Sequence, residues 1–257
     1  SPTASGKSFI IYLLLRYYQQ KFPNFKALII VPTTSLVAQM TSYFADYSKP
    51  DNWNASENVH QIYAGKDKIS SKPIYISTWQ SLYKMNISYY ADFDFILGDE
   101  AHLFKAKSLT SIMEKTINTK YKFGTTGTLD GTLTHKLVLE GLFGETHLVT
   151  TTNELIDKKT LSPFRIKSLV LQYPEEMRKQ IKSYTYKEEI DVIISNEKRN
   201  KFIRNLAISL NTNTLILFQM VENHGKILYD LIKEKAKDGR KVFFVYGGTE
   251  TTDRENI

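Results

Sequence analysis

Short apolar runs alternate with helical patterns along the first half of the chain. Residues 27–31 form a fully apolar run that Pro32 ends, which is typical of a buried strand. Apolar residues recur at helical spacing over 7–22 before this run and over 35–47 after it. The alternation continues to residue 129 and predicts an α/β fold with a parallel sheet. Further strands are expected at 60–63, 74–77 and 93–98.

The pattern changes near residue 150. Residues 175–210 are highly charged with helical spacing, and another helix is expected from His224 to Ala236. Three apolar segments with strand character accompany these helices, at 166–171, 214–218 and 241–246. We therefore expect a first domain at 1–152, a linker at 153–165 and the amino-terminal part of a second domain at 166–257.

Composition narrows the classes of protein. The chain has 257 residues, 42% of them apolar and 24% charged, so it can bury a core and is not disordered. It lacks cysteine, which excludes disulfides, thiolate zinc sites and thiol catalysis. Its net charge of +7 suits a polyanionic partner and an ordinary basic protein equally well. No apolar stretch of about 18 residues is present, so we expect no membrane partner and an intracellular, cytoplasmic location.

The first eight residues, SPTASGKS, have the composition of a phosphate-binding loop. Gly6 allows the tight bend, Lys7 reaches the β and γ oxygens, and the Ser8 hydroxyl binds Mg²⁺, while the helix that follows directs its positive end at the phosphates. A surface loop is the alternative, and transferases that prenylate tRNA carry a related string. The candidate nucleotide-binding residues are Thr3, Ala4, Ser5, Gly6, Lys7 and Ser8.

An acidic box, Gly98-Asp99-Glu100-Ala101-His102, follows the apolar run at 93–98. The run predicts a buried strand that places Asp99 and Glu100 at its carboxyl end, where ligands bind in parallel sheets. Asp99 is the candidate magnesium ligand and Glu100 the candidate catalytic base that orients water, with Lys7 as its catalytic partner on the phosphates. An Asp-Glu pair on a solvated turn is the alternative.

A third box, Phe123-Gly124-Thr125-Thr126-Gly127-Thr128-Leu129, completes the set. With segments 31–39 and 77–81 as motifs Ia and Ib, the order and spacing resemble those of superfamily 2 helicases of the DEAH-box type. The strings IIVPTT, TWQS, DEAH, KFGTTGTL, GLFGE, YKEEI and KRNKFI resemble in particular the UvsW-type recombination helicases of tailed phages. The likeness extends over essentially the whole chain.

The resemblance implies two RecA-like P-loop NTPase lobes with parallel sheets, the second incomplete. It implies a monomeric motor that uses ATP and Mg²⁺ and moves on single-stranded or branched DNA in phage recombination, repair or replication, in the host cytoplasm if phage-encoded. It also implies that His102, Thr126 and Thr128 couple hydrolysis to strand binding. The candidate nucleic-acid contacts are Pro32, Thr33, Thr34, Thr78, Trp79 and His224.

The motifs leave more than one function open. The resemblance places motif IV within 214–246, and no counterpart of motifs V and VI, with their arginines, follows it. No strand precedes Ser1 either, so we expect a fragment that is not competent for hydrolysis by itself. An RNA track, a restriction system, or a non-catalytic ATP- or DNA-binding module would fit the same motifs. Trp79 is at least as compatible with packing beneath its loop, and His224 with a simple helix start. A tRNA prenyltransferase leaves the acidic and threonine boxes unexplained.

Overall fold

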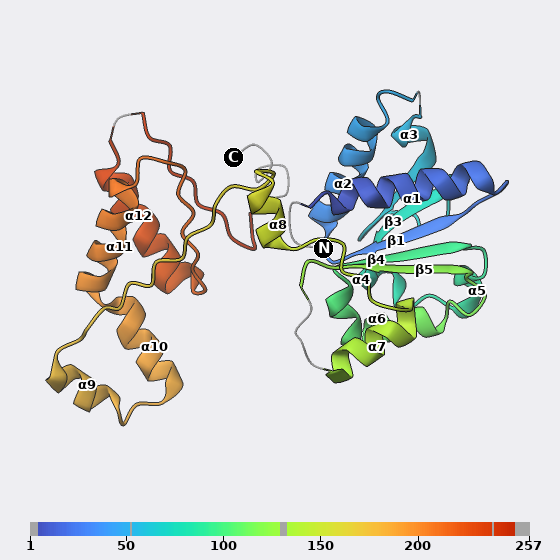
Figure 1. Cartoon of the computed structure of the whole chain (residues 1–257). Coiled ribbons are helices and arrows are strands. Elements are labelled where there is room, and N and C mark those ends of the chain that lie inside the picture. Colours follow the sequence, from blue (N-terminus) through green and yellow to red (C-terminus); the bar gives the residue numbers. More distant parts are fainter. Residues whose placement is uncertain (1–4, 52, 129–132, 238, 250–257) are drawn as a thin grey trace. The chain divides into compact units, whose positions relative to one another are not determined.

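The computed structural model of the protein divides into two compact units (Figure 1), one up to Phe164 and one from Arg165 onward. The boundaries of the functional domains stay a prediction. Each unit is described by itself. The structure describes residues 5–51, 53–128, 133–237 and 239–249.

The first unit is built on a five-stranded parallel sheet with the strand order β2-β3-β1-β4-β5. Because all five strands run the same way, their carboxyl ends meet at one edge, called the carboxyl edge below. Val31 lies beside Thr78 in this register, and Asp99 lies beside Thr125. The strands expected from the apolar runs are confirmed as β1 Ala27–Val31, β2 Val59–Ile62, β3 Ile74–Thr78 and β4 Phe95–Asp99, and β5 Tyr121–Thr125 completes the sheet.

Helices cover both faces of this sheet (Figure 1). Ala27, Ile29 and Val31 of β1 face helices α1 and α2, whereas Leu28 and Ile30 face the helices of the opposite side. The central strand β1 is therefore apolar at every position, as burial on both faces requires. One face carries α1 Lys7–Lys21, α2 Thr34–Tyr47 and α3 Ala55–Asn58. The other packs against α4 Trp79–Leu82, α5 Ile87–Tyr90, the 3-10 helix η1 Ala101–Lys105, α6 Lys107–Glu114 and α7 Leu133–Phe143.

The first unit also contains α8, Thr152–Asp157, which confirms the short capped helix expected near 153–157. Thr151 and Glu154 form a reciprocal capping box at its start, with the Glu154 N–H donating to Thr151 Oγ1 at 3.2 Å. Within the described part of the chain, no helix combines the length and the apolar character needed to cross a bilayer.

The second unit is helical in its described residues, which confirms the helices expected from the charged pattern. Helices α11 and α12 bury Ala207 and Leu228. A single π-helical turn, η2, leads directly into α12, so the regular helix begins at Lys226 and not at His224. The elements are α9 Glu175–Ile181, α10 Tyr186–Ser195, α11 Glu197–Ser209, η2 Val221–Gly225 and α12 Lys226–Lys235.

The expectation of strands at 166–171, 214–218 and 241–246 is wrong for the described structure, in which these segments form no β-ladder. The second and third segments each turn one side toward the helices, and the ring of Phe218 stacks on that of Phe244 with centroids 5.3 Å apart. The other side of the second segment is open, with Leu217 84% exposed. A parallel strand needs hydrogen-bonded neighbours and cover on both faces, and these segments have neither.

Candidate functional site

The candidate phosphate loop ends at Gly6, directly before α1. Gly6 has a φ of +83°, and a Cβ there would meet nothing within 4 Å, so the backbone conformation and not space requires glycine. The first turn of α1 has neither a side-chain cap nor an acidic residue. The positive end of α1 is therefore compatible with a phosphate group. Ser5, Lys7 and Ser8 lie in the described part of this loop, whereas Thr3 and Ala4 lie outside the described residues.

Lys7 and the threonine box line the same cavity, of about 430 Å³. Thr125, Thr126 and Thr128 come from the end of β5 and the turn after it, and Ala101 comes from the start of η1. The cavity therefore brings together the first and third sequence motifs, which are more than a hundred residues apart in the chain. Its volume lies within the range of ordinary small-molecule sites.

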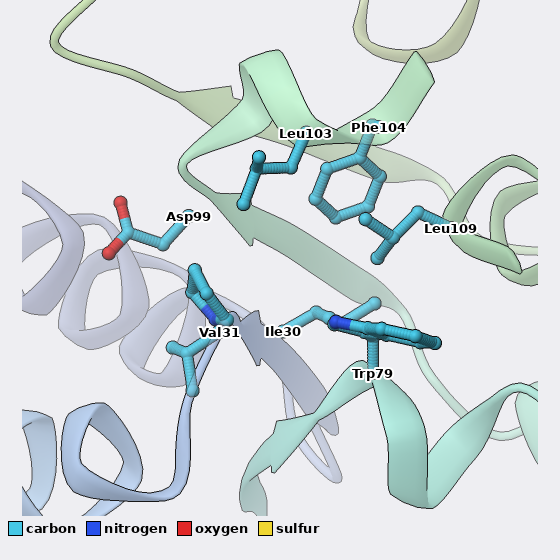
Figure 2. Close-up of a pocket in the computed structure, with 8 residues that line it drawn as sticks. Ile30, Val31, Trp79, Asp99, Leu103, Phe104 and Leu109 are labelled. Atoms are coloured by element: carbon cyan, nitrogen blue, oxygen red, sulfur yellow. The ribbon is translucent and has the colours of Figure 1, made fainter. Parts of the chain in front are cut away.

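Asp99 is the last residue of β4, at the carboxyl edge predicted from the sequence. The Thr125 hydroxyl donates a hydrogen bond of 2.8 Å to Asp99 Oδ1, which fixes the carboxylate. Figure 2 shows the carboxylate turned away from Trp79 and Leu109. No cluster of three or more His, Cys, Asp or Glu suited to a metal exists among the described residues. A magnesium ion would thus be held by Asp99, Ser8, phosphate oxygens and water, a ligand set that this cation commonly takes.

The chain turns sharply between Asp99 and η1. A Cβ on Gly98 would lie 2.5 Å from Cζ of Phe104, so only glycine lets η1 fold back onto the end of β4. Glu100 then adopts the left-handed region, with φ 51° and ψ 53°. This conformation is uncommon for a residue with a side chain and costs on the order of 1 kcal/mol or more. The strained turn brings the side chains of Glu100 and His102 together.

His102 joins the acidic box to the threonine box. Its Nδ1 lies 2.8 Å from Thr126 Oγ1 and 3.3 Å from Glu100 Oε2. The Thr126 hydroxyl donates to the Thr128 carbonyl at 2.9 Å, so it accepts from His102 and Nδ1 carries the proton. His102, Thr126 and Thr128, the three residues predicted to couple hydrolysis to strand binding, are thus hydrogen-bonded in series.

His135 is a neighbour of this network that no sequence motif indicated. It lies on α7, its side chain is buried, and its Nε2 donates to the carbonyl oxygen of His102 at 3.0 Å. This bond ties α7 to η1 at His102. The sequence offers only one hint of this role: His135 lies in the segment that directly follows the threonine box.

Two of the candidate nucleic-acid contacts in the first unit are open at the carboxyl edge. Thr33 and Thr34 are exposed at the start of α2, where the Leu36 N–H donates to Thr33 Oγ1 at 3.4 Å. Pro32, before them, is half-buried. Thr78 lies at the end of the adjacent strand but is only 5% exposed, and its Oγ1 is 3.1 Å from the Ser81 hydroxyl. A nucleic-acid strand bound at this edge can therefore reach Thr33 and Thr34 more readily than Thr78.

Trp79 packs beneath the carboxyl edge. Figure 2 shows its ring beside Leu109 and Phe104, in a small pocket that Ile30 and Leu103 also line. The side chain is partly buried against the helices of that face. The ring of Trp79 thus packs against the core next to the end of β3, which carries Thr78, as the packing alternative describes.

His224 lies in the second unit and is buried, at 7% exposure, within the π-helical turn η2. The Arg199 guanidinium donates to its Nε2 at 3.3 Å, which requires a neutral ring. Burial, and next the charge of Arg199, lower the pKa of His224. In this arrangement the ring of His224 faces Arg199 and is shielded from solvent, whereas Arg199 itself is half-buried.

Residues 1–131 match the sequence profile of the family described as type III restriction enzyme, res subunit. The chain is 36% identical over 260 residues to the ATP-dependent DNA helicase UvsW of Enterobacteria phage T4. The alignment covers 98% of this chain and 50% of that protein. The chain therefore spans about half the length of this curated relative.

Solved structures agree with this match. A crystal structure of T4 UvsW superposes with a TM-score of 0.51 at 35% identity, covering all of this chain and 50% of that one. The helicase domain of Pyrococcus furiosus Hef superposes with a TM-score of 0.53 at 18% identity, covering 92% of this chain and 50% of that one, and supports the fold alone. The RecA-like α/β fold class and the resemblance to UvsW-type superfamily 2 helicases are confirmed, and the chain belongs to the family described as type III restriction enzyme, res subunit.

Proposed function

We propose that these residues form the motor core of an ATP-dependent DNA helicase or translocase that acts in phage recombination, repair or replication. One observation carries the proposal: the His102 imidazole contacts both Glu100, the candidate water-orienting base, and Thr126 of the threonine box. A simple nucleotide-binding protein needs no such connection. A motor needs one, because hydrolysis must change the conformation of a track-binding surface.

The nucleotide chemistry follows from the positions of four groups. Lys7 and a magnesium ion, held by Ser8 and Asp99, would neutralise charge on the phosphates as the γ-phosphoryl group leaves. Glu100 would orient the attacking water and accept its proton. The strained backbone at Glu100 and its contact with His102 hold this carboxylate in one orientation, as an orienting base requires.

The threonine box gives the site a route to the track. Movement of Thr126 and Thr128 at the end of β5 would follow changes in the Glu100–His102 contact. We infer that the exposed Thr33 and Thr34, at the carboxyl edge of the same sheet, contact phosphates of a single-stranded or branched DNA. A monomer acting in the host cytoplasm is the simplest form of such a motor.

The family description favours a second candidate, a subunit of a restriction system that also moves on DNA. The 36% identity to a phage helicase over nearly the whole chain supports a helicase more strongly. A motor that moves on RNA would use the same nucleotide site, as would a module that binds ATP or DNA without catalysis. Turnover and its response to each nucleic acid distinguish these functions.

The test is phosphate release with and without single-stranded DNA, measured on the gene product that carries residues 1–257. Lys7→Ala should weaken magnesium-nucleotide binding about tenfold or more, by roughly 1.4 kcal/mol. Glu100→Gln should keep nucleotide affinity and lower turnover by roughly 10² or more. His102→Gln should keep basal turnover within a few-fold and remove most of the stimulation by DNA.

Lys49→Ala and Glu114→Gln are the matched controls, because both side chains are exposed and lie outside the cavity. Unchanged turnover in Glu100→Gln would exclude Glu100 as the base. Stimulation by DNA that survives His102→Gln would remove the coupling argument. Stimulation by RNA but not by DNA would favour the RNA track.

A further inference from the structure

A second cavity, of about 420 Å³, opens at the edge of the sheet opposite the nucleotide site. Its residues precede β1, precede and begin β3, and precede β4, so they gather at the amino ends of these strands. The two sites therefore lie toward opposite ends of strands that are roughly 17 Å long. We call it the amino-edge cavity; the lining residues that carry the argument are Lys26, Lys68, Ile69, Tyr75, Lys84 and Phe93.

The amino-edge cavity is positively charged. Lys26, Lys68 and Lys84 line it, and Asp92 is the only acidic residue among the lining positions. Lys26 Nζ lies 3.8 Å from Asp92 Oδ2, at the long end of an ion pair, and the Asp92 side chain is 74% exposed. A pair of this kind contributes little and is easily replaced by another carboxylate. The cavity can therefore accept added negative charge.

The walls of the cavity are fixed before any ligand binds. The Lys26 N–H donates to Asp94 Oδ2 at 3.2 Å, and its ammonium lies 5.3 Å from the centroid of the Tyr75 ring. The Tyr89 hydroxyl donates to the Lys68 carbonyl at 2.9 Å and holds the loop before β3. The Lys115 ammonium donates to the Met85 carbonyl at 2.9 Å and holds the loop that carries Lys84. A preformed site of this kind binds without a large ordering cost.

Apolar surface adjoins the charge. Ile69 lines the cavity and is 78% exposed, and Ile87, which lies in the chain between the lining residues Asn86 and Ser88, is 51% exposed. The rings of Tyr75 and Phe93 are almost fully buried, so they form the wall but present no free face. Base stacking in nucleic-acid sites needs an open aromatic face, and Tyr89, the third ring that lines the cavity, is itself partly buried, with its hydroxyl bonded to the Lys68 carbonyl. Ammonium groups beside exposed aliphatic side chains fit carboxylates beside aliphatic side chains instead.

We propose that the amino-edge cavity is a docking site for an acidic peptide segment of a partner protein, in which carboxylates alternate with aliphatic side chains. The carboxylates pair with Lys26, Lys68 and Lys84, and an aliphatic side chain packs on Ile69. The site lies on the rigid sheet but away from the carboxyl edge. A partner bound there leaves the nucleotide cavity and the exposed threonines accessible.

The test uses the 257-residue chain and a short fluorescein-labelled peptide in which glutamate alternates with leucine. Fluorescence anisotropy should show saturable binding that weakens with added salt, because the interaction is between charges near the surface. Lys84→Glu and Lys68→Glu should each reduce the affinity by about tenfold, since like charges then face each other across the interface. Lys49→Glu makes the same charge change on an exposed lysine outside the cavity and should leave the affinity unchanged.

Two control peptides separate the parts of the proposal. Glutamine in place of glutamate should abolish binding, and serine in place of leucine should weaken it. Ile69→Ser should mimic the serine peptide without disturbing the fold, because this side chain is exposed. Binding that is indifferent to Lys84→Glu and Lys68→Glu would overturn the site. The proposal would also fail if these two variants weakened binding of a labelled single-stranded oligonucleotide and not of the acidic peptide.

Discussion

Similar apolar segments form a β-sheet in the first unit of the chain but no β-ladder in the described residues of the second. In the first unit, β1 and β4 are apolar runs that lie at the centre of a parallel sheet with helices on both faces. In the second, residues 214–218 and 241–246 are mostly apolar runs of similar length, yet they form no ladder, and Leu215 and Leu217 are each 84% exposed. Strand character in the sequence is therefore not enough to make a strand.

The difference lies in what surrounds each segment. Strand β1 has β3 on one side and β4 on the other, and its side chains enter both cores. The segment 241–246 contacts helix α12 through Phe244, whose ring lies 5.3 Å from that of Tyr229, but its other face has no cover. Parallel pairing is a non-local event that depends on several segments meeting at once. A helix such as α12 makes its backbone hydrogen bonds within its own segment and needs only one packed face, to which the buried Leu228 belongs.

The largest expected effect separates two leucines. Leu97→Ala, at a fully buried site in β4, should lower the free energy of unfolding of the first unit by about 2–5 kcal/mol, since it removes packing and leaves a cavity. Leu217→Ala should change the second unit by no more than about 0.5 kcal/mol, because its side chain is already solvated. Hydrogen exchange of amides in β1 for the first variant, and in α12 for the second, measures both.

Phe244→Ala is the control inside the second unit. It removes a ring that packs on Phe218 and Tyr229, so amides of α12 should exchange faster in this variant than in Leu217→Ala. Equal effects of Leu217→Ala and Phe244→Ala would mean that both sides of these segments are covered in solution. The contrast drawn between the two units would then be wrong.

The same contrast explains how far sequence reasoning reaches. The apolar runs at 27–31 and 93–98 predicted β1 and β4 because full burial leaves a local signature. The apolar run also predicted that Asp99 lies at the carboxyl end of its strand. The structure places it there, hydrogen-bonded to Thr125 at the end of β5. The segments at 166–171, 214–218 and 241–246 carried a similar signature without the neighbours that a ladder needs, which no local pattern reveals.

The site shows the same limit at the level of single residues. Gly6 and Lys7 were found by their motif, and His102 was named through the family resemblance. The left-handed backbone at Glu100 was not predicted, because it depends on Phe104 packing against Gly98. His135 was missed because its bond to the His102 carbonyl spans 33 residues. Tertiary packing decides both features.

A smaller effect tests where the first unit contacts DNA. Thr34→Ala should weaken binding of a single-stranded oligonucleotide by roughly two- to tenfold, as one hydrogen bond contributes about 0.5–1.5 kcal/mol. The loss should be the same for different base sequences, because phosphate contacts carry no sequence information. Thr212→Ala, on an exposed loop of the second unit, is the matched control and should have no effect. Fluorescence anisotropy on several oligonucleotides makes the measurement, and a loss confined to one sequence would contradict a phosphate contact.

The smallest effect concerns pH and the second unit. Burial and Arg199 lower the pKa of His224 from its ordinary value of 6.5. In the pH range just below that value the unfolded chain binds a proton that the folded unit rejects, so folding is opposed there. The contribution of the neutral ring is complete above about pH 6.5 and is lost as the pH falls through the lowered pKa of the folded state.

Hydrogen exchange in α11 and α12 should therefore speed up between about pH 7.5 and about pH 5, after correction for intrinsic exchange. His224→Gln removes the titrating ring and keeps an amide that can accept from Arg199, so its protection should not change over this range. Amides of β1 in the same samples are the internal control, because β1 belongs to the first unit and His224 to the second. If protection in α12 fell equally in the wild type and in His224→Gln, another group would be responsible, and the Arg199–His224 contact would not control the acid stability of the second unit.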